Sequence, residues 1–343
     1  MSFRYLVAAI AVIFVSSDQV SLAEEVSAPS LPANPLRLQL PTAPEGYGSR
    51  PAIIAAIGLG QLKLIDPKES ELPPGVREVK DIEYGKVGDR SLQLDLALPT
   101  ATTDRKVPGL IFIHGGAWSG GERTVYHYYT RRFAAMGFAA ATISYRLSGE
   151  APYPAAVEDA KCAVRWMRSH ADEYHIDAER LAVIGGSAGG HLSMMVGYCD
   201  LPELEGSGGW ASTSSRVAAV VNFYGPVDLT TEEGQRASPV KKFLGGTYDE
   251  RPDVYRQASP LYSLDAADPP TLVIHGTLDE TVSIAQADML AKRLDEVKVP
   301  YAYQRMEGWP HTLDAVQVTN DHCRQLMQLF FAKFLDAQPP AAP

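Results

Sequence analysis

Residues 181–190 read LAVIGGSAGG, and this stretch decides the class of fold. Residues 181–184 have the length and composition of a buried strand, and they lead directly into closely spaced glycines around Ser187. An apolar helical pattern follows over residues 188–198. A serine between glycines at a strand-to-helix turn is the G-x-S-x-G arrangement that exposes a nucleophile at the end of a sheet. A glycine-rich phosphate loop is the alternative, but no lysine follows the glycines, which argues against a Walker-type loop.

Strand and helix patterns alternate along the chain on both sides of this turn. Apolar runs or period-two alternation predict strands at residues 92–98, 110–113, 139–143, 181–184, 217–223, 271–274 and 301–306. Apolar residues at helical spacing predict helices at residues 154–171, 188–198, 284–297 and 322–335. This alternation predicts an α/β fold with a mostly parallel central sheet flanked by helices on both faces. Ligands bind such sheets at the carboxyl ends of the strands, so functional residues are expected immediately after strands.

A second glycine-rich loop, HGGAW at residues 114–118, follows another predicted strand. Glycines at this position let backbone N–H groups turn toward one point. We expect the N–H groups of Gly116, Ala117 and Ala188 to form an oxyanion hole. The Trp118 side chain either lines the substrate pocket or packs under the loop, and the sequence leaves both open.

Six motifs together carry a resemblance to a known family. The chain resembles α/β-hydrolase serine esterases of the hormone-sensitive-lipase group and of the neighbouring feruloyl-esterase-like (BD-FAE-like) branch, over roughly residues 76–337. The lipase-like group usually carries a third glycine after HGG and an acidic residue before the serine. This chain has Ala117 and Gly186 there, which looks more like the second branch. The motifs are HGGAW at 114–118, SYRL at 144–147, YPAAVEDA at 153–160, GGSAGGHL at 185–192, PPTLVIHGTLDETV at 269–282 and GWPHT at 308–312.

The resemblance implies the remaining site residues and the chemistry. Ser187 matches the family's nucleophile, Asp279 its acid and His311 its base, in the chain order Ser, Asp, His. Glu280 is the local rival of Asp279 for the acid. Trp309, two residues before His311, is expected to line the substrate pocket. Serine-ester chemistry of this kind needs no cofactor.

Eight histidines compete for the role of base. His191 lies one helical turn beyond the serine on a buried helix, so it cannot easily reach the nucleophile. We expect His114 to hydrogen-bond its own loop, His275 to pack at a strand end and His322 to start the last helix. No histidine pair has H-E-x-x-H spacing and the cysteine spacing fits no zinc site, so no metal is expected.

Composition limits the classes of partner. The chain of 343 residues has 31 basic and 41 acidic residues, a net charge of −10, which argues against nucleic acid as the main partner. No apolar run reaches about 18 residues, so no stable membrane insertion is expected after signal cleavage. The three cysteines allow at most one disulfide within the chain.

The chain divides into four predicted parts. Residues 1–23 have a basic start, an apolar stretch and a small-x-small end, which predict a signal peptide and a secreted or periplasmic protein. Residues 24–75 are a proline-rich arm, of which the apolar stretch 52–65 is expected to dock on the main body. Residues 76–337 form the catalytic domain and residues 338–343 a flexible tail. The charged, turn-rich region 230–259 reads as an insertion beside the site.

The sequence favours a secreted serine carboxylic-ester hydrolase that works through an acyl-enzyme. Acetylated or feruloylated polysaccharide and small esters are the expected substrates. A peptidase or amidase of the same fold is one alternative, although such enzymes usually carry a large extra domain that the arm is too short to supply. A non-catalytic binding protein is the other, and the complete Ser, Asp, His set argues against it. The oligomeric state is left open.

Overall fold

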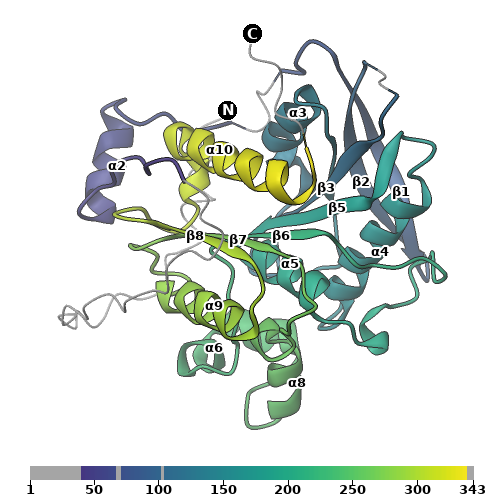
Figure 1. Cartoon of the computed structure of the whole chain (residues 1–343). Coiled ribbons are helices and arrows are strands. Elements are labelled where there is room, and N and C mark those ends of the chain that lie inside the picture. The colour runs from purple at the N-terminus through teal and green to yellow at the C-terminus, as the bar shows by residue number, and fades with distance from the viewer. Residues whose placement is uncertain (1–39, 67–70, 102–103, 338–343) are drawn as a thin grey trace. The chain divides into compact units, whose positions relative to one another are not determined.

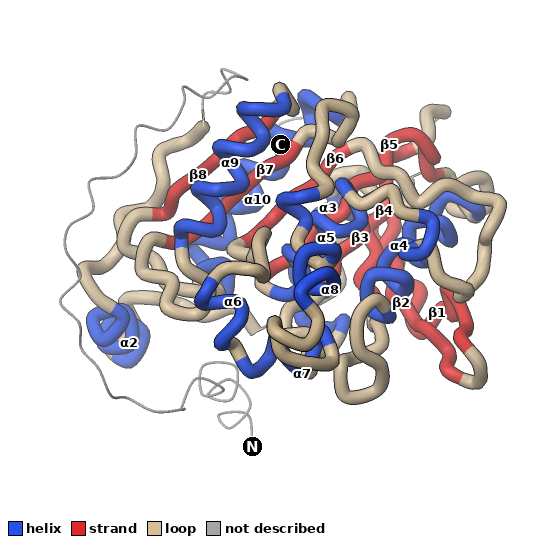
Figure 2. Tube along the Cα trace, turned by 90° about the horizontal axis from the view of Figure 1, so that it is seen from below, coloured by secondary structure: helices blue, strands red, loops and turns tan. Residues whose placement is uncertain are grey.

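The part of the chain that the structure describes is built around one central β-sheet. The computed structural model describes residues 40–66, 71–101 and 104–337, so the predicted signal peptide and C-terminal tail lie outside it. Eight strands among these residues form a sheet in the order β1-β2-β4-β3-β5-β6-β7-β8, with β1 and β8 at opposite edges (Figures 1 and 2). The strands are β1 (Val76–Val87), β2 (Arg90–Pro99), β3 (Val107–Ile113), β4 (Ala139–Ile143), β5 (Ile176–Gly186), β6 (Ala219–Phe223), β7 (Thr271–Gly276) and β8 (Tyr301–Met306).

The six strands from β4 to β8 in this order all pair in parallel, whereas β2 is antiparallel to both β4 and β1. The prediction of a mostly parallel α/β sheet is therefore confirmed. The carboxyl ends of β3, β5, β7 and β8 meet at one edge of the sheet, because these strands run in the same direction. The loops that leave this edge carry the residues predicted to do chemistry.

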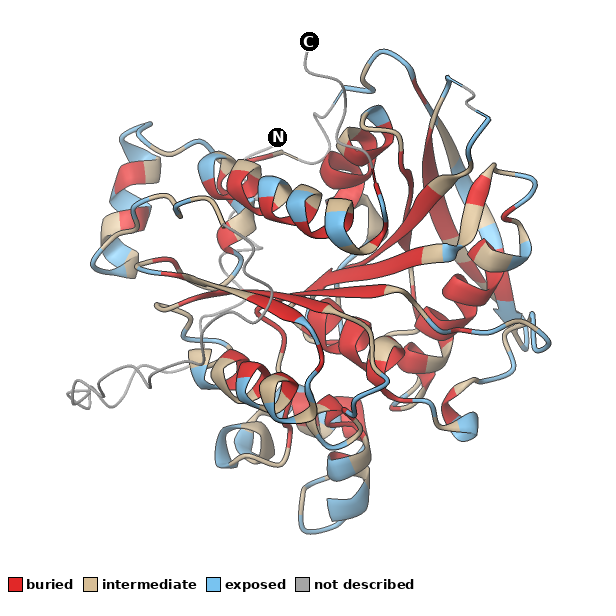
Figure 3. Cartoon of the chain, in the orientation of Figure 1, coloured by how far each residue is buried: buried red, intermediate tan, exposed pale blue. Residues whose placement is uncertain are grey.

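Helices cover both faces of the sheet. Side chains of α3 and α10 share one apolar core with alternate residues of the strands, and side chains of α4, α5 and α9 share the other (Figure 1). The central strands are buried between helices whose outer faces are exposed, whereas the edge strand β1 is largely exposed or half-buried (Figure 3). None of the described helices has the length and apolar character to cross a membrane. The α-helices are α2 (Arg50–Gly58), α3 (His127–Ala135), α4 (Ala155–Ser169), α5 (Ala188–Tyr198), α6 (Glu232–Arg236), α7 (Ser238–Leu244), α8 (Pro252–Gln257), α9 (Ile284–Val297) and α10 (Gln317–Phe334). Short 3-10 helices are η1 (Arg123–Tyr126), η2 (Pro202–Leu204), η3 (Pro260–Tyr262) and η4 (Leu313–Ala315).

Several elements differ from those that the sequence predicted. β1 was not predicted, because it is an edge strand whose many charged residues hide the period-two alternation. α3 was not predicted either, since polar residues such as His127 and Arg131 are buried on it. α10 begins at Gln317 and not at His322. Region 230–259 contains three short helices, α6 to α8. The three cysteines, Cys162, Cys199 and Cys323, are all free and buried.

The described part of the proline-rich arm packs on loops at the carboxyl edge of the sheet. α2 begins after Ser49, whose side chain accepts a hydrogen bond from the Ala52 N–H, and Pro51 lies in its first turn, where a missing N–H costs nothing. The apolar stretch 52–65 does contact the main body, since Ile65 donates its N–H to the Ala315 carbonyl at 2.9 Å. The arm thereby contacts the segment between β8 and α10.

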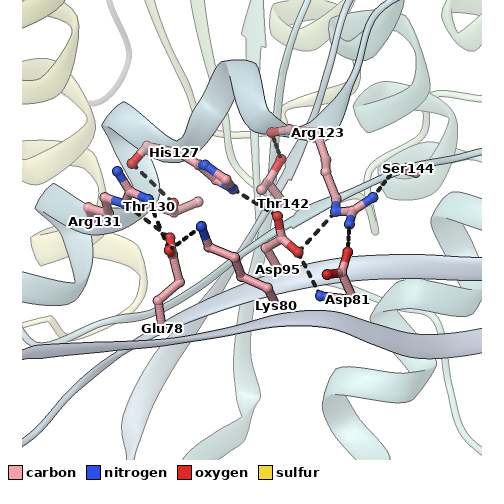
Figure 4. Close-up of polar contacts among 10 residues, drawn as sticks. All are labelled: Glu78, Lys80, Asp81, Asp95, Arg123, His127, Thr130, Arg131, Thr142 and Ser144. Atoms are coloured by element: carbon pink, nitrogen blue, oxygen red, sulfur yellow. Dashed lines mark hydrogen bonds and ion pairs between the residues drawn. The ribbon is translucent and has the colours of Figure 1, made fainter. Parts of the chain in front are cut away.

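A buried ion-pair network ties the antiparallel hairpin to η1 and α3 (Figure 4). The Asp95 carboxylate accepts a hydrogen bond from His127 Nε2 at 2.8 Å, and Arg123 Nε lies 3.0 Å from it. Arg131 donates to both carboxylate oxygens of Glu78, at 3.0 and 2.9 Å. Burial opposes ionisation of Asp95, but hydrogen bonds from His127, the Asp81 backbone and Arg123 together lower the pKa of its carboxyl to about 2. We call this set the β1–α3 network.

Candidate active site

Ser187 lies on a strained turn between β5 and α5. Its φ of 56° and ψ of −123° are sparsely populated for a residue with a side chain, and such strain gathers at functional positions. The Ser187 N–H donates to the Phe223 carbonyl at 2.9 Å, which fixes the turn against β6. A Cβ at Gly189 would lie 1.9 Å from the Ile113 carbonyl oxygen, so only glycine lets the first turn of α5 approach the end of β3. The local sequence therefore holds Ser187 at the carboxyl edge of the sheet.

The structure brings the three predicted catalytic side chains into one hydrogen-bonded line. His311 Nε2 lies 3.0 Å from Ser187 Oγ, and His311 Nδ1 lies 2.7 Å from Asp279 Oδ2. The three residues come from the loops after β5, β7 and β8. The Asp279 side chain is fully buried, whereas that of His311 is 11% exposed. With a proton on Nδ1 donated to Asp279, Nε2 is left to accept the Ser187 proton.

The Asp279 carboxylate accepts several hydrogen bonds besides the one from His311. The N–H groups of Thr281 and Val282 donate to Oδ1, each at 2.8 Å. His275 Nε2 lies 3.1 Å from Oδ2. Burial opposes ionisation, but the hydrogen bonds from His275 and His311 outweigh it and hold the pKa of the Asp279 carboxyl below its ordinary value. The group is therefore an anion at any working pH.

Two predictions about this loop can be compared with the structure. His275 does sit at a strand end, but the sequence analysis missed its contact with Asp279. The signal was available, because an i, i+4 His–Asp spacing directly after a strand can fold back on itself. Glu280, the rival acid, points away: its side chain is 67% exposed and pairs with Arg50 at 3.3 Å.

The HGGAW loop presents backbone N–H groups beside Ser187. Gly116, Ala117 and Trp118 have φ values of 118°, 52° and 54°, which turn successive peptide groups. Within the described ranges, the N–H groups of Gly116 and Ala117 have no hydrogen-bond partner. A Cβ at Gly115 would lie 3.3 Å from Ser187 Cβ, so the loop lies against the nucleophile.

The third predicted oxyanion donor is the N–H of Ala188. Ala188 is the first residue of α5, where backbone N–H groups have no carbonyl partner within the helix. The positive end of the helix dipole lies at the same point. Ala188 follows Ser187 in the chain, and Gly116 and Ala117 follow Gly115, which lies against Ser187, so the residues of all three predicted donors lie near the nucleophile.

The two tryptophans differ in what the sequence predicts: it leaves Trp118 open between lining the pocket and packing under its loop, whereas it predicts that Trp309 lines the pocket, and the structure places Trp309 differently. Trp118 is 4% exposed, stacks on Phe243 with ring centroids 4.5 Å apart, and donates its indole N–H to His191 Nδ1 at 3.2 Å. Trp309 is fully buried and donates to the Pro44 carbonyl at 3.0 Å. Both side chains pack beneath the loops that they belong to, because a tryptophan with a satisfied N–H gains most from burial.

All eight histidines are described, and His311 is the one that hydrogen-bonds to Ser187. His191 is buried and pairs with the Ala258 carbonyl at 2.7 Å, and burial lowers its pKa to about 4. His114 pairs with the carbonyl of Gly115 at 2.8 Å, and burial lowers its pKa to about 4 as well. Both are neutral structural groups. Among the described residues, no three His, Cys, Asp or Glu side chains are placed to hold a metal ion.

A model of one protein family, named BD-FAE, matches residues 94–294. The match covers more than half of the 343 residues and includes Ser187 and Asp279, but it ends before His311.

Curated relatives agree with this match. Esterase LipC of Mycobacterium tuberculosis is 34% identical over 225 residues, which cover 61% of this chain and 54% of LipC. The chain spans little more than half the length of LipC and of two further curated relatives from Mycobacterium tuberculosis, LipM and LipQ, between 54% and 58%.

Two solved structures are similar over most of their own length. A truncated carbohydrate esterase from gut microbiota is 28% identical, with a TM-score of 0.66 over 76% of this chain and 96% of that one. A butyrate-bound esterase, Est2, from the Planctomycetes species Thermogutta terrifontis is 25% identical, with a TM-score of 0.66 over 76% of this chain and 94% of that one.

Proposed function

Since the chain belongs to the BD-FAE family of α/β-hydrolase esterases, we propose that it hydrolyses carboxylic esters with Ser187 as nucleophile. One observation carries the proposal: Asp279, His311 and Ser187 form a continuous hydrogen-bonded line, with distances of 2.7 and 3.0 Å, next to the HGGAW loop. A nucleophile, its base and an oriented carboxylate in this relation are what acyl transfer requires.

Acylation uses each of these groups. Ser187 Oγ attacks the ester carbonyl carbon while His311 Nε2 takes the hydroxyl proton. The negative charge that develops on the carbonyl oxygen is stabilised by the N–H groups of Gly116, Ala117 and Ala188. His311 then gives its proton to the leaving alcohol as the carbon–oxygen bond breaks, which leaves an acyl group on Ser187.

Deacylation repeats the cycle with water. His311 takes a proton from the water, the hydroxide attacks the acyl carbon, and the same N–H groups hold the second oxyanion. The carboxylic acid leaves when His311 returns the proton to Ser187 Oγ. Asp279 stays ionised throughout and stabilises the imidazolium that forms in both halves.

We infer a substrate class from the relatives. One is named a carbohydrate esterase and another is bound to butyrate, which supports short acyl groups on sugars or small alcohols. The proposed substrates are acetylated or feruloylated polysaccharides and small soluble esters, with acetyl esters first.

A substrate panel tests the proposal. The full chain without its predicted signal peptide would be assayed on p-nitrophenyl acetate, acetylated xylan, a feruloyl ester and a proline p-nitroanilide. Turnover of the esters without the anilide is the expected result. Preferential cleavage of the anilide would favour the peptidase or amidase alternative, and no turnover of any substrate would favour a binding protein.

We further propose that the protein is exported and cleaved after residue 23, because the first 23 residues have the pattern of a signal peptide. N-terminal sequencing of protein recovered outside the cytoplasm should begin at Glu24. Recovery of the protein with Met1 intact would contradict this.

A further inference from the structure

Tyr224 is the side chain that packs against the ring of His311. It follows the last residue of β6, and its backbone has a φ of 41°, which is a strained value for a residue with a side chain. Its ring centroid lies 4.7 Å from that of His311, with an angle of 61° between the rings. The Tyr224 side chain is almost fully buried, and its N–H donates to the Ile274 carbonyl at 2.9 Å. The phenol is therefore a rigid wall on one side of the imidazole.

The Tyr224 hydroxyl donates a hydrogen bond to Asp314 Oδ1. Asp314 lies on η4, three residues after His311, so the bond joins the end of β6 to the loop that carries His311. The backbone of Asp314 is held in turn, because Asn320 on α10 donates its side-chain N–H to the Asp314 carbonyl at 2.9 Å. Burial, and then the charge of Asp314, hold the pKa of the Tyr224 phenol well above its ordinary value. The phenol thus remains a hydrogen-bond donor.

Gly186, the residue before Ser187, explains why Tyr224 and Asp314 can lie so close to the site. A Cβ at Gly186 would lie 2.9 Å from the hydroxyl oxygens of both Tyr126 and Tyr224. The space that a larger residue would occupy behind the nucleophile is filled by two phenols. The chain places glycine where an acidic residue stands in the lipase-like group, and a carboxyl group reaches the same region from Asp314.

We propose that Tyr224 is a positioning residue for His311 and that Asp314 holds it in place. The proposal rests on the function proposed above. His311 Nε2 has to face Ser187 Oγ during attack and the leaving oxygen during bond cleavage, so it must keep one orientation through both steps. Tyr224 blocks rotation of the imidazole away from this line, and the Tyr224–Asp314 hydrogen bond keeps the phenol from withdrawing.

The leaving group of the substrate separates positioning from general damage to the fold. Cleavage of ethyl acetate needs a proton from the His311 imidazolium for its alkoxide, whereas p-nitrophenolate leaves without one. Misplacement of His311 should therefore harm turnover of ethyl acetate more than turnover of p-nitrophenyl acetate. A smaller fraction of folded enzyme would lower both equally.

The experiment compares kcat/KM on both esters, per active site titrated with a fluorophosphonate. Tyr224→Phe keeps the ring and loses the hydroxyl, and it should lower kcat/KM for ethyl acetate by about 10- to 100-fold but for p-nitrophenyl acetate by only a few-fold. Tyr198→Phe is the matched control, because the Tyr198 hydroxyl is also buried and lies 2.7 Å from Thr271 Oγ1 at the other end of the sheet. This control should change neither value.

The Asp314 variants test the second half of the proposal. Asp314→Asn can still accept from Tyr224 and should stay within about threefold of the wild type, whereas Asp314→Ala should resemble Tyr224→Phe, and the two changes together should cost no more than one. Equal loss on both esters in Tyr224→Phe, or normal activity of that variant, would overturn the positioning role. A wild type that hydrolyses neither ester would instead refute the proposed function.

Discussion

Two Asp–His pairs in this protein have nearly the same geometry and different surroundings. Asp279 pairs with His311 at 2.7 Å, and Asp95 of the β1–α3 network pairs with His127 at 2.8 Å. Burial opposes ionisation of each carboxyl group and hydrogen bonds outweigh it, so both pKa values lie below their ordinary range. The histidine side chains are exposed to a similar small extent, 11% and 7%. Neither the contact nor the burial tells the two pairs apart.

What separates the pairs is the third group. The second nitrogen of His311 lies 3.0 Å from the hydroxyl oxygen of Ser187, which stands on a strained turn at the start of α5. Asp95 instead has a cation, Arg123, 3.0 Å away, which makes the pair part of an ion network. A close Asp–His contact is thus a weak sign of catalysis, and the further group that contacts the pair decides its role.

The largest expected effect comes from removing the Ser187 hydroxyl. Ser187→Ala should lower kcat by about 10⁴- to 10⁶-fold, because the nucleophile is lost while the fold stays intact. Fluorophosphonate labelling should vanish with it. Ser193→Ala is the matched control on the same helix, since Ser193 donates to the Gly189 carbonyl at 2.9 Å and should remain labelled. Labelling of Ser187→Ala at another serine would show that the nucleophile is elsewhere.

Substitution of the acid in the first pair should have the next largest effect. Asp279→Asn keeps the shape of the side chain but cannot stabilise the imidazolium, and an amide can hold His311 in the wrong tautomer. We expect kcat to fall by about 10⁴-fold. Steady-state rates on p-nitrophenyl acetate measure the loss, and near-normal turnover would exclude Asp279 as the acid.

The same substitution in the second pair should act on stability. Asp95→Asn removes the buried carboxylate that faces the Arg123 guanidinium and accepts from His127, so the free energy of unfolding should fall by about 3–5 kcal/mol. Urea denaturation measures this, and kcat per titrated active site should stay close to that of the wild type. A large fall in kcat with unchanged stability would mean that the two pairs had been assigned the wrong way round.

The difference in stability between the wild type and Asp95→Asn should depend on pH. The pKa of Asp95 is about 2 in the folded protein and about 3.9 in an unfolded chain, so the unfolded state binds the proton first as the pH falls. Its contribution, between about 2 and 3 kcal/mol, is therefore complete above about pH 5 and is lost as the pH falls toward 2. The difference between the urea midpoints of the two proteins should shrink as the pH falls from 6 to 2. Parallel curves would contradict this linkage.

The smallest effect is expected from removing the ion-pair partner of Glu280, the residue that follows Asp279. Arg50→Gln breaks the exposed pair with Glu280 and should change the free energy of unfolding by less than about 1 kcal/mol. Activity should hardly change, although Glu280 is the neighbour of Asp279. A loss of activity comparable to that of Asp279→Asn would show that Glu280 contributes to the site.

The sequence predicted the parts of the molecule that local rules determine. Strand, turn and helix around Ser187 follow from apolar runs and glycines, and the chain order of Ser187, Asp279 and His311 follows from the motifs. The contacts that come from distant segments could not be predicted. Tyr224 meets Asp314 across 90 positions, and Trp309 is buried because the arm covers it. An edge strand rich in charge, such as β1, is equally hidden, since its alternation depends on the network that it joins.

The contacts of the arm affect the order in which parts of the protein can fold. The Pro44 carbonyl accepts its hydrogen bond from Trp309, 265 positions later, and Leu64 pairs with Val316 in an isolated bridge. A ribosome releases the early partner of each contact long before the late one exists. Residues 44 and 64 of the arm therefore cannot form these native contacts until nearly the whole described chain has been synthesised. Contacts between residues far apart in the sequence form slowly. The contacts between the arm and the segment that carries His311 should therefore be among the last to form during biosynthesis.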